Sequence, residues 1–129
     1  DVKKDFLGNY QIFINRGKSK VSNDVIKEIE KFSDLGAGEI VINNIDRDGT
    51  MIGYDLRLAK ICYQASQIPI TFLGGAKSHE DISNLIKETG TVGCGAGSIF
   101  VFKGKYKAVL INYPSVEQKL KINDNIDEL

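Results

Sequence analysis

Residues 39–50 read Glu-Ile-Val-Ile-Asn-Asn-Ile-Asp-Arg-Asp-Gly-Thr, and this stretch decides the fold class of the chain. Its first half is an apolar, β-branched run of strand length, typical of a strand buried on both faces of a parallel sheet. Its second half is polar and contains a glycine, and a helical pattern from Asp55 to Ala65 follows it. A strand, a polar loop and a helix in this order indicate one unit of an α/β fold.

The same order of strand, loop and helix recurs twice more along the chain. A second apolar strand at 68–73 precedes Gly74 and Gly75, and a helix that Ser78 caps and Gly90 ends follows it. A strand of small residues at 92–97 precedes a short helical turn at 98–102. Successive units of about thirty residues predict parallel strands joined by helices, as in a doubly wound sheet or a barrel.

Weaker patterns mark the two ends of the chain. An aromatic and β-branched run at 10–15 predicts a strand or hairpin arm, and the helix after it can be capped by Ser22 or Asn23 and ended by Gly36. Residues 108–111 are expected to be extended and residues 115–122 helical. Because no strand precedes Asp1, we expect that the chain was cut from a longer one.

Composition excludes several classes of function. The 17 basic residues balance the 17 acidic ones, so no overall positive field attracts nucleic acid or an anionic membrane. Cys62, Cys94 and His79 show no metal-ligand spacing, and we expect neither a metal nor a cofactor. No apolar run reaches the length of a membrane span and no secretory leader opens the chain, so the sequence predicts a soluble cytoplasmic protein.

Glycines gather in the loops that follow the expected strands. Gly49, the Gly74–Gly75 pair and Gly97 with Ser98 would present backbone N–H groups close to the starts of helices, where such groups bind phosphate. In phosphate-binding barrels the anion often lies between the loops after the last two strands and a short extra helix. A tight turn without any ligand is the alternative for Gly74 and Gly75 taken alone.

Two aspartates stand at the end of the strand at 39–45. One of Asp46 and Asp48 can fold back into salt bridges with Arg47 or lysines, while the other faces the mouth of the fold. A carboxylate in that place can act as a general acid or base. A turn that caps the next helix is the alternative for Asp46. His79 is expected at the surface, and both cysteines are expected to serve packing.

At this point the motifs resemble one family over about residues 1–102. They are Gly36-Ala37-Gly38-Glu39-Ile40, Ile45-Asp46-Arg47-Asp48-Gly49-Thr50, Gly53-Tyr54-Asp55, Pro69-Ile70, Gly74-Gly75-Ala76 and Ala96-Gly97-Ser98. Together they are similar to the second half of the cyclase subunit of imidazole glycerol phosphate synthase. The string from Ile45 to Thr50 with the following Gly53-Tyr54-Asp55 is the most specific of them.

The resemblance implies a fold and an activity. Residues 1–129 would be the C-terminal half of a phosphate-binding (β/α)8 barrel, or TIM barrel, containing strands 5 to 8 with their helices, and the N-terminal half would be absent. The family is a lyase of histidine biosynthesis. It uses ammonia from a glutaminase partner to form imidazole glycerol phosphate and an aminoimidazole ribotide from a doubly phosphorylated substrate. The 129-residue chain alone would be inactive.

The resemblance also assigns roles to residues. Asp1 matches the catalytic aspartate at the end of the fifth strand, and Asp48 would contact the substrate and assist. Glu39 matches the glutamate of the charged gate through which ammonia enters. The residues that would hold one of the two phosphates are Gly49, Gly75, Gly97 and Ser98.

Departures from the family pattern widen the range of possible functions. Leu73 stands where the family has serine, Asn43-Asn44 where it has Thr-Ser, and Arg16-Gly17 where it has Ser-Gly. The tail at 102–114 resembles a paralogous branch found with surface-polysaccharide and flagellin sugar genes and linked to acetamidino groups on sugars. The chain could also be an inactive half-barrel that forms a homodimer, or a doubly wound enzyme that binds phosphate through the same loops.

Overall fold

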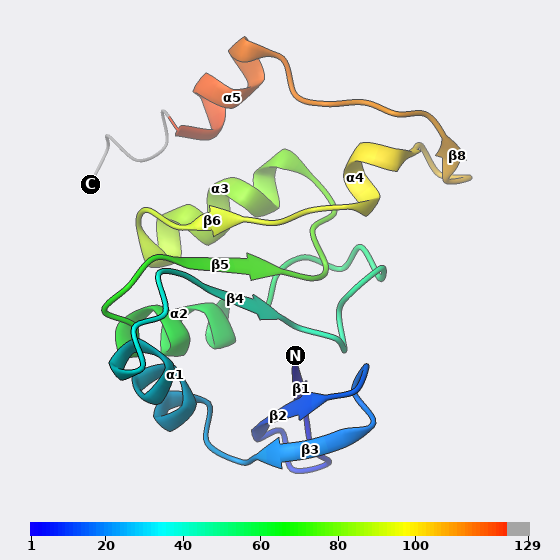
Figure 1. The fold of residues 1–129 in the computed structure, drawn as a ribbon. Coiled ribbons are helices and arrows are strands. Elements are labelled where there is room, and N and C mark those ends of the chain that lie inside the picture. Colours follow the sequence, from blue (N-terminus) through cyan, green and yellow to red (C-terminus); the bar gives the residue numbers. More distant parts are fainter. Residues whose placement is uncertain (124–129) are drawn as a thin grey trace.

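The structure, a computed structural model, describes residues 1–123. A parallel sheet stands at its centre, with the strand order β4–β5–β6. An antiparallel sheet of β1, β2 and β3 lies beside it, and a two-stranded ribbon of β7 and β8 follows β6 along the chain (Figure 1). The strands are β1 (Val2–Lys4), β2 (Tyr10–Ile14), β3 (Ser19–Ser22), β4 (Ile40–Asn43), β5 (Ile70–Leu73), β6 (Gly93–Cys94), β7 (Phe102–Lys103) and β8 (Ala108–Val109).

The central strands follow one another in chain order. Ile40 pairs with Ile70 in a parallel register, and Phe72 pairs with Cys94. A single parallel bridge from Val2 to Asn44 attaches β1 to the end of β4. Within residues 1–123 the order therefore contains no switch point, which a doubly wound sheet would require and a barrel does not.

Two helices, α2 (Leu56–Ala65) and α3 (His79–Thr89), cover one face of this sheet. The other helices are α1 (Val25–Asp34), which packs against α2, α4 (Ser98–Val101), which follows β6, and α5 (Val116–Asn123), which packs against α3. Figure 1 shows α2 and α3 on the same side of β4 and β5. Ser78 and Asp81 form the expected capping box at the start of α3, and Gly90 ends that helix as expected.

The expected cap of the first helix is wrong. Asp24 caps α1, because its side chain accepts a hydrogen bond from the Lys27 N–H at 3.1 Å. Ser22 is the last residue of β3 and pairs with Ile12, so it lies too early in the chain to cap. The strand expected at 92–97 is also shorter in the structure, since only Gly93 and Cys94 make ladder pairs.

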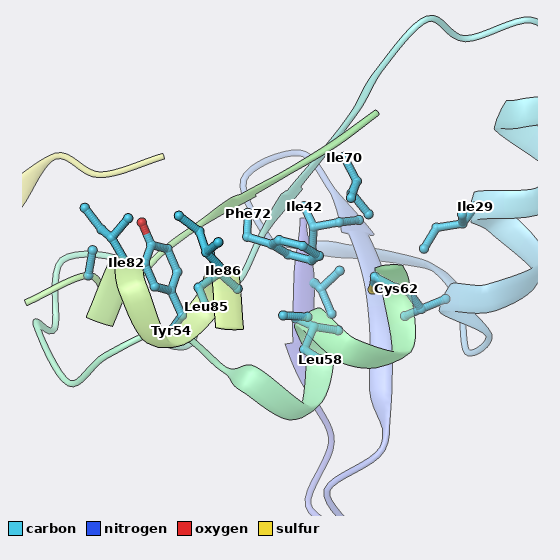
Figure 2. Packing of buried hydrophobic residues seen from close by; sticks show 14 of the residues in the cluster. Ile29, Ile42, Tyr54, Leu58, Cys62, Ile70, Phe72, Ile82, Leu85 and Ile86 are labelled. Atoms are coloured by element: carbon cyan, nitrogen blue, oxygen red, sulfur yellow. The ribbon is translucent and has the colours of Figure 1, made fainter. Parts of the chain in front are cut away.

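The hydrophobic core lies between the central sheet and the helices. Figure 2 shows Ile42 and Phe72 of the sheet packed toward Leu58 of α2 and Leu85 of α3. Cys62 is fully buried in this core, as expected, and burial raises the pKa of its thiol to about 12. The core accounts for the helical periodicity of α2 and α3.

The apolar run of β4 predicts that the strand is buried on both faces, and this prediction is wrong for the described residues. Val41 is 56% exposed, although its neighbour Ile42 is only 7% exposed. Successive side chains of a strand point to opposite faces, and the helices cover only the face of Ile42. The face that carries Val41 is uncovered within residues 1–123.

None of the helices within residues 1–123 is both long and apolar enough to span a membrane. In the same part of the chain, no three His, Cys, Asp or Glu side chains are grouped so that they could hold a metal ion. The residues that gather around the carboxyl ends of the central strands are glycines and small side chains instead.

Candidate active site

Three loops meet at the carboxyl ends of β4, β5 and β6. Figure 1 shows that these loops leave the sheet at the same edge. They enclose a small pocket, which we call the rim pocket. Its lining consists of Asp48, Gly49, Met51, Leu73, Gly74, Gly75, Ala76, Gly95, Ala96, Gly97 and Ser98. Five of the residues singled out from the sequence therefore lie together, namely Asp48, Gly49, Gly75, Gly97 and Ser98.

Glycine is required at two positions of the rim pocket. Gly74 and Gly75 have φ angles of 105° and 98°, in a region that L side chains rarely adopt. A Cβ atom on Gly74 would collide with the carbonyl oxygen of Asn44, and one on Gly75 would collide with that of Gly53. The β5 loop can therefore pass this close to the β4 loop only without side chains.

The helices next to the rim pocket differ in how their first turns are satisfied. At α3, the backbone N–H groups of Lys77 and Ser78 donate to the Asp81 carboxylate at 2.9 and 3.1 Å. The N–H groups at the start of α3 are therefore already satisfied by a carboxylate of the same helix. At α4, Gly97 is the N-cap and no side chain caps the turn within the described chain. The backbone donors around Ser98 are the ones left for an external anion.

Asp48 lines the rim pocket, and its carboxylate makes no hydrogen bond or ion pair within residues 1–123. Its backbone N–H donates to the Asn44 carbonyl at 3.0 Å, which holds the turn in which Asp48 lies. The side chain is exposed. A free carboxylate at the edge of a pocket can accept a proton or a hydrogen bond from a ligand.

Asp46 has a different role from either sequence interpretation. Its Oδ2 accepts a hydrogen bond from the backbone N–H of Lys4 at 2.7 Å, so it ties the β4 loop to β1. The interpretation of Asp46 as the cap of the next helix is wrong, because Asp55 caps α2. Arg47 makes no salt bridge with Asp46. Its Nη1 donates instead to the carbonyls of Gly53 and Tyr54, both at 2.9 Å.

Asp1 lies at the same edge of the sheet as the rim pocket. Its Oδ1 accepts a hydrogen bond from Nδ2 of Asn43, the last residue of β4, at 3.1 Å. The Asp1 side chain is exposed, and it does not line the rim pocket. The Oδ1 atom of Asn43 is buried without a hydrogen-bond partner among the described residues. Asn43 therefore orients the carboxylate that the resemblance singled out.

Glu39 lies at the opposite end of β4 from Asp1. Its Oε1 accepts a hydrogen bond from the Thr71 hydroxyl at 2.6 Å, and its side chain is exposed. The four residues of β4 separate it from the edge with the rim pocket. At about 3.3 Å per residue, the two edges are roughly 13 Å apart. Glu39 is therefore not part of the pocket.

One buried carboxylate, which the sequence interpretation used as a helix start and as part of the motif Gly53-Tyr54-Asp55, joins β1, β2 and α2. The Asp55 carboxylate accepts hydrogen bonds from the Tyr10 hydroxyl at 3.0 Å and the Leu58 N–H at 3.2 Å, and the Lys4 ammonium lies 2.8 Å away. Burial by itself raises the pKa of Asp55, but the hydrogen bonds from Lys4, Leu58 and Tyr10 outweigh it, and the pKa is lowered. An aspartate directly before an apolar helix was the signal for the cap; nothing in the sequence signalled Lys4 or Tyr10.

Sequence comparison identifies the class of protein to which this arrangement belongs. The profile of the family described as "Histidine biosynthesis protein" matches residues 1–107. The chain belongs to this family. The family folds as (β/α)8 barrels, and a parallel sheet with helices on one face is the structure expected of half a barrel, which confirms the fold class.

Curated relatives narrow the resemblance to one subunit. The chain is 48% identical over 120 residues to "Putative imidazole glycerol phosphate synthase subunit HisF" of Leptospira borgpetersenii, which covers 92% of the chain and 47% of the relative. It is 48% identical over 122 residues to "Putative imidazole glycerol phosphate synthase subunit hisF3" of Vibrio vulnificus, with 94% and 47% covered. It is 35% identical over 124 residues to "Imidazole glycerol phosphate synthase subunit HisF" of a Hydrogenobaculum species, with 96% and 47% covered. The chain spans about half the length of these relatives.

Proposed function

We propose that the chain supplies part of the active site of a cyclase subunit of imidazole glycerol phosphate synthase, a lyase of histidine biosynthesis. The observation that carries the proposal is the rim pocket, in which Asp48 and the glycine loops after β4, β5 and β6 meet. The likeness to HisF subunits supports the same reaction class. The reaction would form imidazole glycerol phosphate and an aminoimidazole ribotide from ammonia and a doubly phosphorylated substrate.

In this proposal the rim pocket holds one phosphate of the substrate. The backbone N–H groups of Gly49, Gly75 and Gly97 and the hydroxyl of Ser98 are the donors. Backbone donors are suited to this task because they are fixed before the ligand arrives and need no reorganisation. Asp48 contacts the substrate at the edge of the pocket.

Asp1 acts as the general acid or base in this proposal. It lies at the same edge as the rim pocket, and Asn43 holds one of its carboxylate oxygens. A carboxylate held by one donor keeps its second oxygen available for proton transfer to the bound substrate. The partner aspartate and the second phosphate site belong to the half of the barrel that lies outside residues 1–129, so we place the chain as strands 5 to 8.

Ammonia would enter from the opposite edge of the sheet. Glu39 lies there, exposed and hydrogen-bonded to Thr71. We place the gate of the barrel at Glu39 and the glutaminase partner at this edge of the sheet. We also propose that the protein works in the cytoplasm. The separation of the two edges along β4 keeps the ammonia entrance away from the phosphate, which is what transfer through a barrel requires.

Genetic rescue tests the proposed reaction. A full-length gene, which encodes the proposed N-terminal half of the barrel together with this chain, is expressed in a bacterial strain that lacks its own HisF subunit and cannot grow without histidine. Growth without histidine is the expected result, and an Asp1→Asn variant should not restore it. Failure of the unchanged gene to restore growth, with its product present and folded, would contradict the histidine reaction.

A paralogous function is the second candidate. The two relatives at 48% identity carry names marked as putative, one of them numbered as hisF3, whereas the Hydrogenobaculum HisF is 35% identical. The chain is thus more similar to those proteins than to the plainly named HisF subunit. In this case ammonia would serve acetamidino formation on a surface or flagellin sugar. Loss of sugar amidination on deletion of the gene, together with failure to rescue histidine growth, would favour it.

A further inference from the structure

One buried phenol links the core to the rim pocket. Tyr54 is 6% exposed, and Figure 2 shows its ring beside Ile82 and Ile86 of α3. Its hydroxyl donates a hydrogen bond to the carbonyl oxygen of Gly95 at 2.7 Å. Gly95 belongs to the loop between β6 and α4, which forms one side of the rim pocket.

The residues on either side of Tyr54 join the other loops. The Gly53 N–H donates to the Gly75 carbonyl at 2.7 Å, which connects the β4 loop to the β5 loop. The Arg47 guanidinium donates to the carbonyls of Gly53 and Tyr54 and so closes the β4 loop on itself. Residues 53–54 therefore make contact with both of the other loops around the rim pocket.

The hydrogen bond from Tyr54 fixes the direction of a peptide group. A trans peptide carries its C=O and its N–H on opposite sides, and the described chain contains no cis peptide. The carbonyl of Gly95 points to Tyr54, so the N–H of Ala96 points away from it. Ala96 lines the rim pocket, and its N–H makes no hydrogen bond within residues 1–123.

The phenol is suited to act as a permanent donor. Burial raises the pKa of the Tyr54 hydroxyl well above its usual value, and the nearby Cys94 and Asp81 raise it further by smaller amounts. The hydroxyl therefore keeps its proton at any physiological pH. A buried tyrosine hydroxyl without a partner would be costly, and the Gly95 carbonyl satisfies it.

We propose that Tyr54 is a positioning residue for the rim pocket: its hydroxyl holds the Gly95 carbonyl against the core and thereby presents the Ala96 N–H to the bound anion. The inference rests on the proposed phosphate site and adds Ala96 to its donors. Tyr54 itself does not line the pocket, so it acts through the Gly95–Ala96 peptide.

The test is a titration of the 129-residue chain with inorganic phosphate, followed by the amide signals of the ¹⁵N spectrum. Tyr54→Phe keeps the ring and removes only the hydroxyl. We expect it to weaken phosphate binding about fivefold, the loss of roughly one neutral hydrogen bond, and to shift the Ala96 amide signal before any phosphate is added. Tyr63→Phe is the matched control, because Tyr63 lies on α2 at 39% exposure and outside the pocket.

The outcomes distinguish the role of Tyr54 from the existence of the phosphate site. Unchanged phosphate affinity in a folded Tyr54→Phe chain would overturn the role of Tyr54, even if that variant unfolds at lower urea concentration. A wild-type chain that binds no phosphate would overturn the rim pocket as an anion site and the inference with it. An equal loss of affinity in Tyr63→Phe would show that the effect does not pass through Gly95.

Discussion

The Lys4 ammonium lies 2.8 Å from the carboxylate of Asp55, and the two side chains join β1 to the start of α2. Asp55 also caps α2 through its hydrogen bond from the Leu58 N–H. A single carboxylate thus satisfies a helix end, a lysine and the Tyr10 hydroxyl. This contact therefore holds β1 to α2.

We predict that Asp55→Asn destabilises the chain by about 2 kcal/mol, the cost of losing hydrogen bonds to a charged group. Asparagine can still cap the helix, so the loss reports the charge rather than the cap. Lys4 is 36% exposed, and water weakens the pair, which keeps the cost below that of a fully buried one. Urea unfolding at pH 7 measures it. Asp24→Asn, at the more exposed cap of α1, is the control and should cost less than about 0.5 kcal/mol.

The effect of Asp55 should depend on pH in one direction. Its pKa is lowered from 3.8 in the folded chain, so its stabilisation is present above pH 3.8 and is lost as the pH falls through the folded value. The difference in unfolding free energy between wild type and Asp55→Asn should therefore shrink below that pH. A difference that stays constant as the pH is lowered from neutral through this range would show that the carboxylate charge is not what stabilises the fold.

Much of the fold follows from local patterns. Ser78 and Asp81 predict the start of α3 because a capping box depends on residues three apart. Asp48, Gly75 and Gly97 are predicted to lie close together because the carboxyl ends of parallel strands share one edge of a sheet. Both are properties of short segments, or of their order along the chain.

Other features depend on how distant segments pack. The hydrogen bond from Tyr54 to Gly95 spans 41 positions, and neither residue type signals the other. Lys4 and Asp55 are brought together by the single bridge from β1 to β4. The exposure of Val41 has the same origin, because an apolar run looks alike whether or not a second layer covers it.

Gly75→Ala should destabilise the chain by roughly 2 kcal/mol or more, since its backbone has a φ of 98° and the added Cβ collides with the Gly53 carbonyl. Thermal unfolding measures the loss. Gly38→Ala is the matched control, because nothing lies within 4 Å of its Cβ position and its φ is not in the left-handed region. Equal stability of the two variants would show that the β5 loop does not need its close approach to Gly53.

The uncovered face of the central sheet predicts self-association of the 129-residue chain. Val41 is 56% exposed in the middle of β4, and exposed apolar strands favour pairing with other chains. Light scattering after size exclusion should show dimers at micromolar concentration, and Val41→Lys should shift the chain toward monomers. Leu35→Lys, at 73% exposure just after α1, should not. A wild-type chain that remains monomeric would contradict this prediction and the homodimer hypothesis.

Asp48→Asn should tighten binding of inorganic phosphate about fivefold, because it removes a like charge from the edge of the rim pocket; two unit charges 4 Å apart in water repel by about 1 kcal/mol. In the assembled enzyme the same change should lower kcat by about tenfold, the loss of roughly one hydrogen bond between the substrate and a charged group. Asp34→Asn, at the end of α1, is the control for charge alone. Weaker phosphate binding in Asp48→Asn would show that Asp48 does not border the anion.

The rim pocket as a phosphate site is tested most directly by adding inorganic phosphate to the ¹⁵N-labelled chain and following its amide signals. The donors proposed at the pocket predict saturable shifts that are largest at Gly49, Gly75, Ala96, Gly97 and Ser98, with Gly38 unchanged at the opposite edge. Shifts that are absent from these amides, or that are spread evenly over the surface lysines, would contradict the account.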